Sequence, residues 1–199
     1  MHLNGVTIFV DRDGTLNEDP GYLKHPADLI LYPGVVEGVA RLKQGGCQVV
    51  LVTNQSGIGR GLLTRTDLQA VHERLQAMLK QGGGELDGIF FCPHVPDAAC
   101  ECRKPKTGLI RQAVEELGVE VIRSYVVGDK RCDMELAHNA GSIGVLVSTT
   151  PVSQEAIDAA SRGLFSIEKN TRSFVEAVDW ILHDAKTRPW NDPIPRLHE

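Results

Sequence analysis

Two carboxylates stand two residues apart in the segment Asp11-Arg12-Asp13-Gly14-Thr15, directly after a run of apolar residues. A carboxylate such as Asp11 can attack phosphorus and form an aspartyl phosphate. A second carboxylate, Asp13, can protonate the leaving oxygen and later take a proton from water. Gly14 allows the chain to turn sharply behind them. An acidic turn at a strand end is the alternative, but the position after an apolar run favours phosphoryl transfer.

A second acidic segment, Gly128-Asp129-Lys130-Arg131-Cys132-Asp133, also follows an apolar run. Mg²⁺ prefers hard oxygen ligands and usually takes one or two carboxylates with water and substrate phosphate. We therefore predict a magnesium site formed by Asp11, Asp129 and the backbone carbonyl of Asp13. Asp at a helix start is also a common cap. Asp133 accordingly either caps the following helix or holds a metal-bound water.

Two further segments carry groups that suit a phosphate. Thr53-Asn54-Gln55-Ser56-Gly57 offers a hydroxyl and backbone N–H groups that can hold phosphate oxygens. Arg103-Lys104-Pro105-Lys106 offers cations that can neutralise charge on a transferring phosphoryl group. A polar turn and a solvated basic surface are the respective alternatives.

Three cysteines and a histidine lie within eleven residues: Cys92, His94, Cys100 and Cys102. Thiolates and imidazole are the ligands that suit tetrahedral Zn²⁺. Four protein ligands leave no open position, so we predict a structural zinc that fixes the loop and aims Arg103 and Lys104 at the phosphate. A redox-active or merely buried set of thiols is the alternative. The two other cysteines are predicted to be free thiols, with Cys47 in the core.

The elements that must position these groups alternate between strand and helix. Apolar runs predict strands at residues 6–10, 48–53, 88–92, 125–128 and 143–147, and helical periodicity predicts helices at 34–44, 64–81, 107–117, 133–140, 155–161 and 174–184. Such alternation indicates an α/β fold with a parallel sheet covered on both faces. We expect one doubly wound, Rossmann-like domain over residues 1–188 and a disordered tail over the proline-containing residues 189–199.

The composition excludes several classes. The chain has 199 residues, 42% hydrophobic and 24% charged, which is ordinary for one globular domain. A net charge of −5 argues against general nucleic-acid binding. The sequence has no apolar run of about 18 residues, which argues against a membrane partner. It shows no signal peptide either, so we expect a cytoplasmic protein. A monomer is favoured.

These segments, in this order, resemble the motifs of the haloacid dehalogenase superfamily of phosphohydrolases over residues 6–147. The resemblance implies a nucleophile at Asp11, a general acid/base at Asp13, a phosphate-binding hydroxyl at Thr53, a charge-neutralising lysine at Lys104 and a magnesium ligand at Asp129. No insert between the motifs is long enough for a large cap domain, so we expect a lightly covered crevice.

The zinc loop narrows the resemblance to a group of phosphatases whose substrates are D-glycero-D-manno-heptose 1,7-bisphosphate or histidinol phosphate. Motifs around Asp19, Asn54 and Lys130 favour removal of the 7-phosphate from the heptose bisphosphate, whereas the short spacing between His94 and Cys100 is more similar to the histidinol group. A bisphosphate needs a cation for its second phosphate. We predict substrate contacts from Asn54, Arg60, Arg103 and Lys130, with Arg60 as the first candidate for that phosphate. A phosphosugar-binding module without turnover is the non-enzyme alternative.

Overall fold

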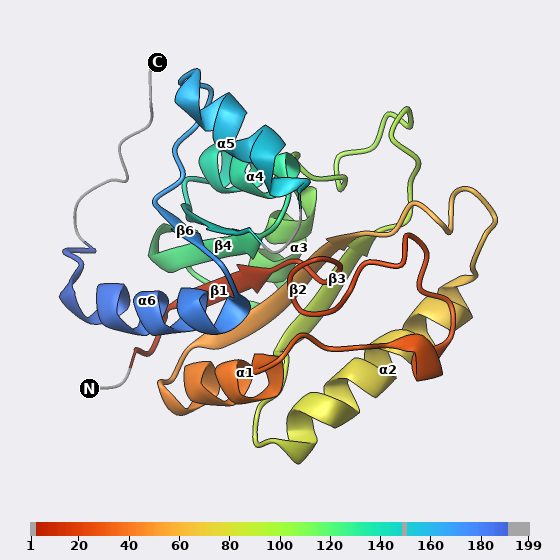
Figure 1. Cartoon of the computed structure of the whole chain (residues 1–199), viewed down its shortest axis with the longest axis horizontal. Coiled ribbons are helices and arrows are strands. Elements are labelled where there is room, and N and C mark those ends of the chain that lie inside the picture. Colours follow the sequence, from red (N-terminus) through yellow and green to blue (C-terminus); the bar gives the residue numbers. More distant parts are fainter. Residues whose placement is uncertain (1–2, 149–150, 191–199) are drawn as a thin grey trace.

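The computed structural model describes residues 3–148 and 151–190. Its centre is a six-stranded, all-parallel sheet in the order β3-β2-β1-β4-β5-β6 (Figure 1). The strands are β1 (Thr7–Val10), β2 (Gln48–Asn54), β3 (Gly88–Cys92), β4 (Ser124–Gly128), β5 (Ile143–Val147) and β6 (Lys169–Thr171). The predicted parallel sheet and Rossmann-like architecture are confirmed.

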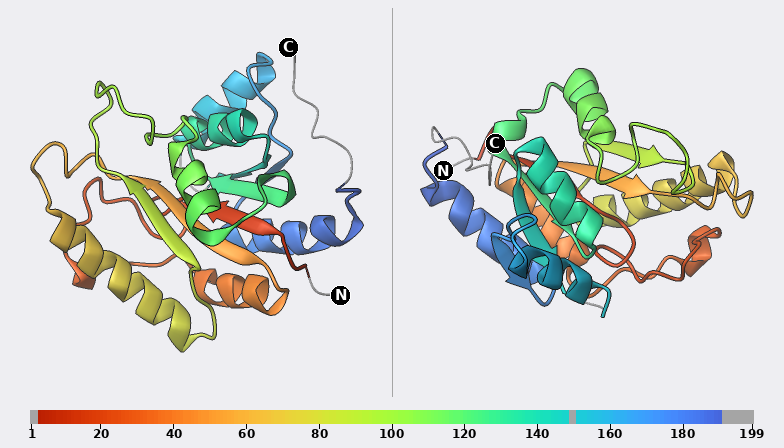
Figure 2. Two further views of the ribbon diagram at one scale, coloured as in Figure 1. Left: turned by 180° about the vertical axis from the view of Figure 1, so that it is seen from behind. Right: turned by 90° about the horizontal axis from the view of Figure 1, so that it is seen from above.

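Helices cover both faces of the sheet (Figures 1 and 2). One face is covered by α1 (Val35–Gln44), α2 (Arg65–Gln81) and α6 (Phe174–Thr187), and the other by α3 (Gly108–Leu117), α4 (Arg131–Ala140) and α5 (Ser153–Ser161). Two short 3-10 helices, η1 (Pro26–Asp28) and η2 (Val121–Arg123), lie in connections. Every residue of β1, β4 and β5 is buried. A central parallel strand has no solvent face, which explains its nearly continuous apolar sequence.

The sequence located these elements to within a few residues. The long helix α2 begins at a capping box: the Thr64 hydroxyl accepts a hydrogen bond from the backbone N–H of Asp67, and the Asp67 carboxylate accepts one from the backbone N–H of Thr64. Helix α6 extends three residues beyond the predicted end at Asp184, to Thr187. Strand β6 was not predicted, because Lys169-Asn170-Thr171 is a short polar edge strand without an apolar pattern.

The sheet register explains where the chemistry gathers. Val10 of β1 pairs with Leu51 of β2 on one side and with Val127 of β4 on the other. The carboxyl ends of β1, β2 and β4 therefore meet at one edge, where ligands bind in open α/β sheets. The connections over residues 11–34, 55–64 and 93–107 project from this edge (Figure 1). Apart from η1, they contain no helix or strand, so no large cap domain covers the edge in the described structure.

An aromatic contact follows the C-terminal helix α6. The Trp190 ring packs edge-to-face on Tyr125 with a centroid distance of 5.7 Å, and its Nε1 donates to the carbonyl of Ala185. Within the expected tail, therefore, Trp190 packs on the domain, and residues 191–199 lie outside the described residues. No helix of the described chain is long and apolar enough to cross a bilayer.

Candidate active site

Three aspartates come together at the carboxyl edge of the sheet. Asp11 follows β1, Asp129 follows β4, and Asp133 lies in the first turn of α4. One carboxylate oxygen from each lies within 4.8 Å of the other two, and all three residues are buried. Buried carboxylates this close repel one another unless cations neutralise them.

Lys104 provides one of these cations. Its buried Nζ lies 2.8 Å from Asp11 Oδ1 and 2.6 Å from Asp133 Oδ1, and it donates to the carbonyl of Val52 at 3.0 Å. Burial favours the neutral amine, but the charges of Asp11 and Asp133 outweigh it and raise the pKa of Lys104. The lysine is therefore a permanent cation beside Asp11. Asp133 also accepts a hydrogen bond from the backbone N–H of Lys130 at 3.1 Å, so it does cap α4.

One carboxylate oxygen of Asp129 lacks a hydrogen-bond donor within the described residues. Its Oδ1 is buried, receives no hydrogen bond from the residues that the structure describes, and lies 4.0 Å from Lys130 Nζ. Burial, together with the charge of Asp11, raises the pKa of Asp129 to about 8. A divalent cation would bind the unpaired oxygen of Asp129 and offset the repulsion between this carboxylate and that of Asp11.

Gly14 makes room for Asp129. Its φ is +90°, and a Cβ built on it would lie 2.2 Å from Asp129 Oδ2. Only glycine tolerates both this backbone conformation and this approach. The glycine of the first motif and the carboxylate of the second are thus packed against each other.

The Asp13 carboxylate is held by four donors. Its Oδ1 accepts from Arg12 Nε at 3.0 Å and from Asn17 Nδ2 at 2.9 Å. Its Oδ2 accepts from Arg12 Nη2 at 2.9 Å and from Gln55 Nε2 at 2.8 Å. Gln55 Nε2 also donates to Thr53 Oγ1 at 3.0 Å. These contacts tie the ends of β1 and β2 together beneath the crevice.

A cavity of about 340 Å³ opens above these groups. Fourteen residues from the carboxyl edge of the sheet and the segments that follow it line the cavity: Asp11, Asp13, Asp19, Gly21, Tyr22, Thr53, Asn54, Gln55, Ser56, Gly57, Arg103, Lys104, Lys130 and Cys132. Carboxylates form one part of the wall, and Arg103, Lys104 and Lys130 supply positive charge. The cavity can therefore receive a small anionic molecule against a potential nucleophile.

Comparison with known proteins identifies the family. A family model described as HAD-hydrolase-like matches residues 101–167. The chain is 42% identical over 169 residues to the D-glycero-beta-D-manno-heptose-1,7-bisphosphate 7-phosphatase of Yersinia pestis, spanning 80% of this chain and 90% of that protein. The chain belongs to the haloacid dehalogenase-like phosphatases. The phosphatase of the same name from Photorhabdus laumondii is 43% identical over 77% of this chain and 87% of its own length.

A solved structure supports the same family. The crystal structure of D,D-heptose 1,7-bisphosphate phosphatase from Bordetella bronchiseptica, complexed with magnesium and phosphate, is 36% identical. It superposes with a TM-score of 0.81 over 90% of this chain and 99% of that one. This haloacid dehalogenase-like phosphatase therefore shares its fold with that relative over most of the chain.

Most of the predicted site residues of this phosphatase line the cavity. Asn54 is among them, but both ends of its side-chain amide are engaged: Oδ1 accepts from the backbone N–H of Lys104, and Nδ2 donates to the Lys104 carbonyl. Asn54 thus holds the lysine segment in place. Arg60 is exposed and is not among the lining residues, whereas Arg103 is.

Lys130 links the metal-ligand candidates to a loop over the cavity. Its Nζ lies 2.9 Å from Asp19 Oδ2 and donates to the Asp13 carbonyl at 3.3 Å. Burial alone would lower its pKa, but the charges of Asp11 and Asp129 raise it. Lys130 is therefore a cation at the rim of the acidic cluster, and it fixes the loop that carries Asp19.

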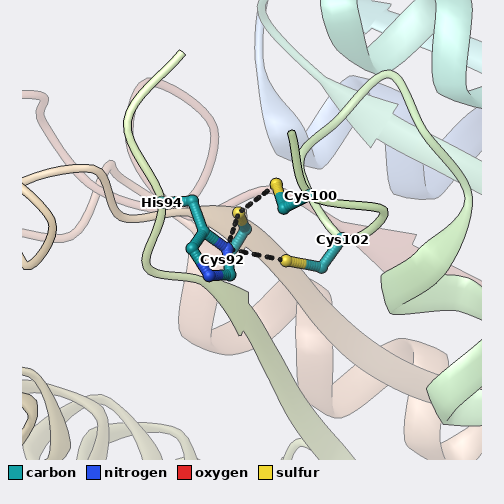
Figure 3. Close-up of side chains that lie close together, drawn as sticks. All are labelled: Cys92, His94, Cys100 and Cys102. Atoms are coloured by element: carbon teal, nitrogen blue, oxygen red, sulfur yellow. Dashed lines mark hydrogen bonds between the residues drawn. The ribbon is translucent and has the colours of Figure 1, made fainter. Parts of the chain in front are cut away.

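The four predicted zinc ligands converge from the two ends of one loop (Figure 3). Cys92 Sγ lies 3.8 Å from Cys100 Sγ and 3.5 Å from His94 Nδ1, and His94 Nδ1 lies 3.2 Å from Cys102 Sγ. A tetrahedron with bonds of about 2.0–2.3 Å separates its ligand atoms by roughly 3.3–3.8 Å. The donor set thus fits zinc in both chemistry and spacing. None of the five cysteines forms a disulfide, and Cys47 lies in the core as predicted.

Sequence reasoning missed the groups that hold Asp13. Arg12 is completely buried, and its partners Gln55 and His72 come from other elements. One signal was available. Arg12 lies between two carboxylates that both enter a buried site, so its own side chain must either be buried or point away from the site. A buried guanidinium needs hydrogen-bond acceptors around it.

Proposed function

We propose that this phosphatase hydrolyses a phosphomonoester through an aspartyl phosphate on Asp11. The observation that carries the proposal is the placement of Asp11 in the cavity wall beside the buried cation of Lys104. An oxygen of Asp11 attacks phosphorus as the bond to the leaving oxygen breaks, and Asp13 gives that oxygen its proton. Asp13 then takes a proton from water, which attacks the aspartyl phosphate and restores Asp11. Lys104 and the Thr53 hydroxyl hold the phosphoryl oxygens.

Magnesium is the cofactor of the proposed reaction. Asp11, Asp129 and the backbone carbonyl of Asp13 would hold it, as hard oxygen ligands do. The orphaned Oδ1 of Asp129 supports this assignment, and the Bordetella relative was crystallised with magnesium and phosphate. When bound, the ion would offset negative charge on the phosphoryl group.

The proposed substrate is D-glycero-D-manno-heptose 1,7-bisphosphate, from which the 7-phosphate is removed. Relatives at 42–43% identity that span most of the chain carry this activity in their names. The second phosphate of such a substrate needs a cation away from the reacting one. Arg103 lines the cavity, and a guanidinium can grip a phosphate through two parallel hydrogen bonds. Lys130 is a further proposed contact, and Asn54, whose side-chain amide holds the Lys104 backbone, supports the site through that segment. Arg60 remains the candidate from the neighbouring loop over residues 55–64, whose Gly59 N–H donates to the carbonyl of Pro93.

The second candidate substrate is histidinol phosphate, which is favoured by the short spacing between His94 and Cys100. An amine and an imidazole at the far end of that substrate would prefer carboxylates to arginines. A turnover panel with both substrates, Mg²⁺ present and absent, decides between them. We expect a much higher kcat/KM for the bisphosphate, and the reverse order would reassign the substrate. Absence of magnesium-dependent turnover on every phosphate ester would support a binding module instead.

Two variants separate the candidate phosphate contacts. Loss of a charged hydrogen bond costs about 1.5–3 kcal/mol, so Arg103→Ala should lower kcat/KM for the bisphosphate by roughly 10–100-fold and barely affect a small monophosphate ester. Arg60→Ala is the matched control and should be nearly neutral. If Arg60→Ala carries the loss instead, its loop moves to the cavity when substrate binds, as the sequence-based prediction requires.

A structural zinc at Cys92, His94, Cys100 and Cys102 completes the proposal. Lys106 Nζ donates to the carbonyl of Cys100, and Arg103 Nη1 donates to the carbonyl of His94. The metal would therefore hold the backbone that positions the basic segment at the cavity. Free thiols and a thiolate-based metal site suit a reducing compartment, so we propose the cytoplasm as its location. A monomer is the oligomeric state that we propose.

A further inference from the structure

The geometry points to Arg12 and His72 as a pair of positioning residues that hold Asp13 in place for proton transfer. The inference rests on the proposed function, in which Asp13 is the general acid and base. It assigns a task to two buried groups that touch neither the cavity nor the acidic cluster.

Arg12 has an unusually restricted environment. Its side chain is completely buried, yet it carries a permanent charge. Nε and Nη2 form the two parallel bonds to Asp13, and Nη2 also reaches Gln55 Oε1 at 3.3 Å. Nη1, on the opposite side of the guanidinium, lies 3.2 Å from His72 Nε2. Because the guanidinium is planar and rigid, an anchor at Nη1 also fixes the two donors that hold Asp13.

His72 is suited to be that anchor. Arginine can only donate, so His72 Nε2 must be the acceptor and the ring must be neutral with its proton on Nδ1. Burial, with the charge of Arg12, lowers the pKa of His72 to about 3, so the acceptor is available at physiological pH. The ring is held from the side by Phe91, edge-to-face at 6.1 Å between centroids. His72 comes from α2, far from the catalytic motifs in sequence.

The contacts of Asp13 explain why its orientation matters. A carboxylate has about four lone-pair positions, and here two donors from Arg12, one from Asn17 and one from Gln55 occupy them. A proton can reach Asp13 only if one donor leaves. The two bonds from Arg12 are charge-assisted and act together, whereas Gln55 lines the cavity and holds Asp13 by one bond. We therefore expect the hydrogen bond from Gln55 to Asp13 to break when the proton arrives, while Arg12, anchored by His72, keeps the carboxyl plane fixed.

The test compares leaving groups. Protonation by a general acid matters for an alkoxide leaving group and little for p-nitrophenolate, which is stable as an anion. In His72→Phe, kcat/KM for a sugar phosphate should fall about 10–100-fold, part of the ~10²–10⁴-fold that a positioned proton donor supplies. The kcat/KM for p-nitrophenyl phosphate, which reports only the steps through loss of the leaving group, should stay within about threefold. His72→Gln, whose amide oxygen can accept from Arg12, should restore most of the sugar phosphate rate.

Two further variants keep the test decisive. If His72→Phe does not fold, His72→Asn replaces it, because the shorter amide stays polar but falls short of Arg12. Leu75→Ala creates a buried cavity on the same helix but keeps both partners of the bond between His72 and Arg12, and it should show no leaving-group selectivity. Equal losses on both substrates in the His72 variants, or no rescue by Gln, would overturn the inference. A wild-type protein that hydrolyses neither ester would instead refute the proposed function.

Discussion

Replacing Gly14 by alanine should disable the magnesium site without touching a ligand. Alanine in the left-handed region costs about 1–2 kcal/mol, and Gly14 has φ +90°. The added Cβ would also lie 2.2 Å from Asp129 Oδ2, where ordinary contacts begin at 3.4 Å, so the carboxylate must move by more than 1 Å. Disturbing the surroundings of a metal ligand typically lowers metal affinity about 10–100-fold.

Gly118→Ala is the matched control. Gly118 also has a positive φ, +66°, but a Cβ there would meet nothing within 4 Å. Both variants should therefore lose about 1–2 kcal/mol from the backbone term, or roughly 2–8 °C in Tm for a chain of this size. Only Gly14→Ala should need a 10–100-fold higher Mg²⁺ concentration for half-maximal activity.

The assay has two readouts. Activity is titrated with Mg²⁺, and thermal unfolding is recorded at a series of Mg²⁺ concentrations, since a ligand of the native state raises Tm. Wild type and Gly118→Ala should share a magnesium midpoint and a Mg²⁺-dependent rise in Tm, and in Gly14→Ala both should move to a 10–100-fold higher Mg²⁺ concentration. Equal magnesium midpoints in Gly14→Ala and Gly118→Ala would refute the assignment of Asp129 as a ligand placed by Gly14.

Three further predictions concern single groups. Asp11→Asn should abolish turnover of every phosphate ester while the folded circular dichroism spectrum is kept, since an amide cannot act as the nucleophile; wild-type-like rates would refute the mechanism. Metal analysis after exhaustive dialysis against Mg²⁺ buffer should find about one zinc per chain, and Cys100→Ser should lose it and impair catalysis through a misplaced Lys104; a zinc-free wild type with full activity would contradict this. In the folded protein the pKa of His72 is about 3, below the ordinary 6.5. As the pH falls, the histidine is therefore protonated in the unfolded chain before it is protonated in the folded one. The stability that the neutral ring contributes is complete above pH 6.5 and is lost as the pH falls, at up to about 1.4 kcal/mol per pH unit. Urea unfolding should show wild type losing up to about 2 kcal/mol more than His72→Gln between pH 6.5 and 5, and parallel curves would contradict it.

Local pattern was enough for the fold and for the chemistry of the motifs. Apolar runs that end in Asp11 and Asp129 predicted two buried parallel strands, and the carboxyl ends of such strands must meet at one edge. The zinc candidates Cys92, His94, Cys100 and Cys102 lie close together in the sequence, so one loop can bring them together. Their convergence could be predicted without knowing any contact between distant segments. Strand β6 was not predicted, because a short polar edge strand has no periodic pattern of apolar residues.

Partnerships between distant residues required the tertiary structure. The two carboxylates beside Arg12 indicate that its side chain is either buried or turned away. They do not predict that the guanidinium reaches His72 on a helix, or that Lys104 also pairs with Asp133. Sequence reasoning made Arg60 the first candidate for the second phosphate, but of Arg60 and Arg103 only Arg103 lines the cavity. The sequence by itself determined which groups reach the carboxyl edge of the sheet, because parallel strands run in one direction and all end at the same edge. Which of them touch depends on side-chain packing between segments, and a buried charge takes its partners from whatever the fold brings within hydrogen-bond distance.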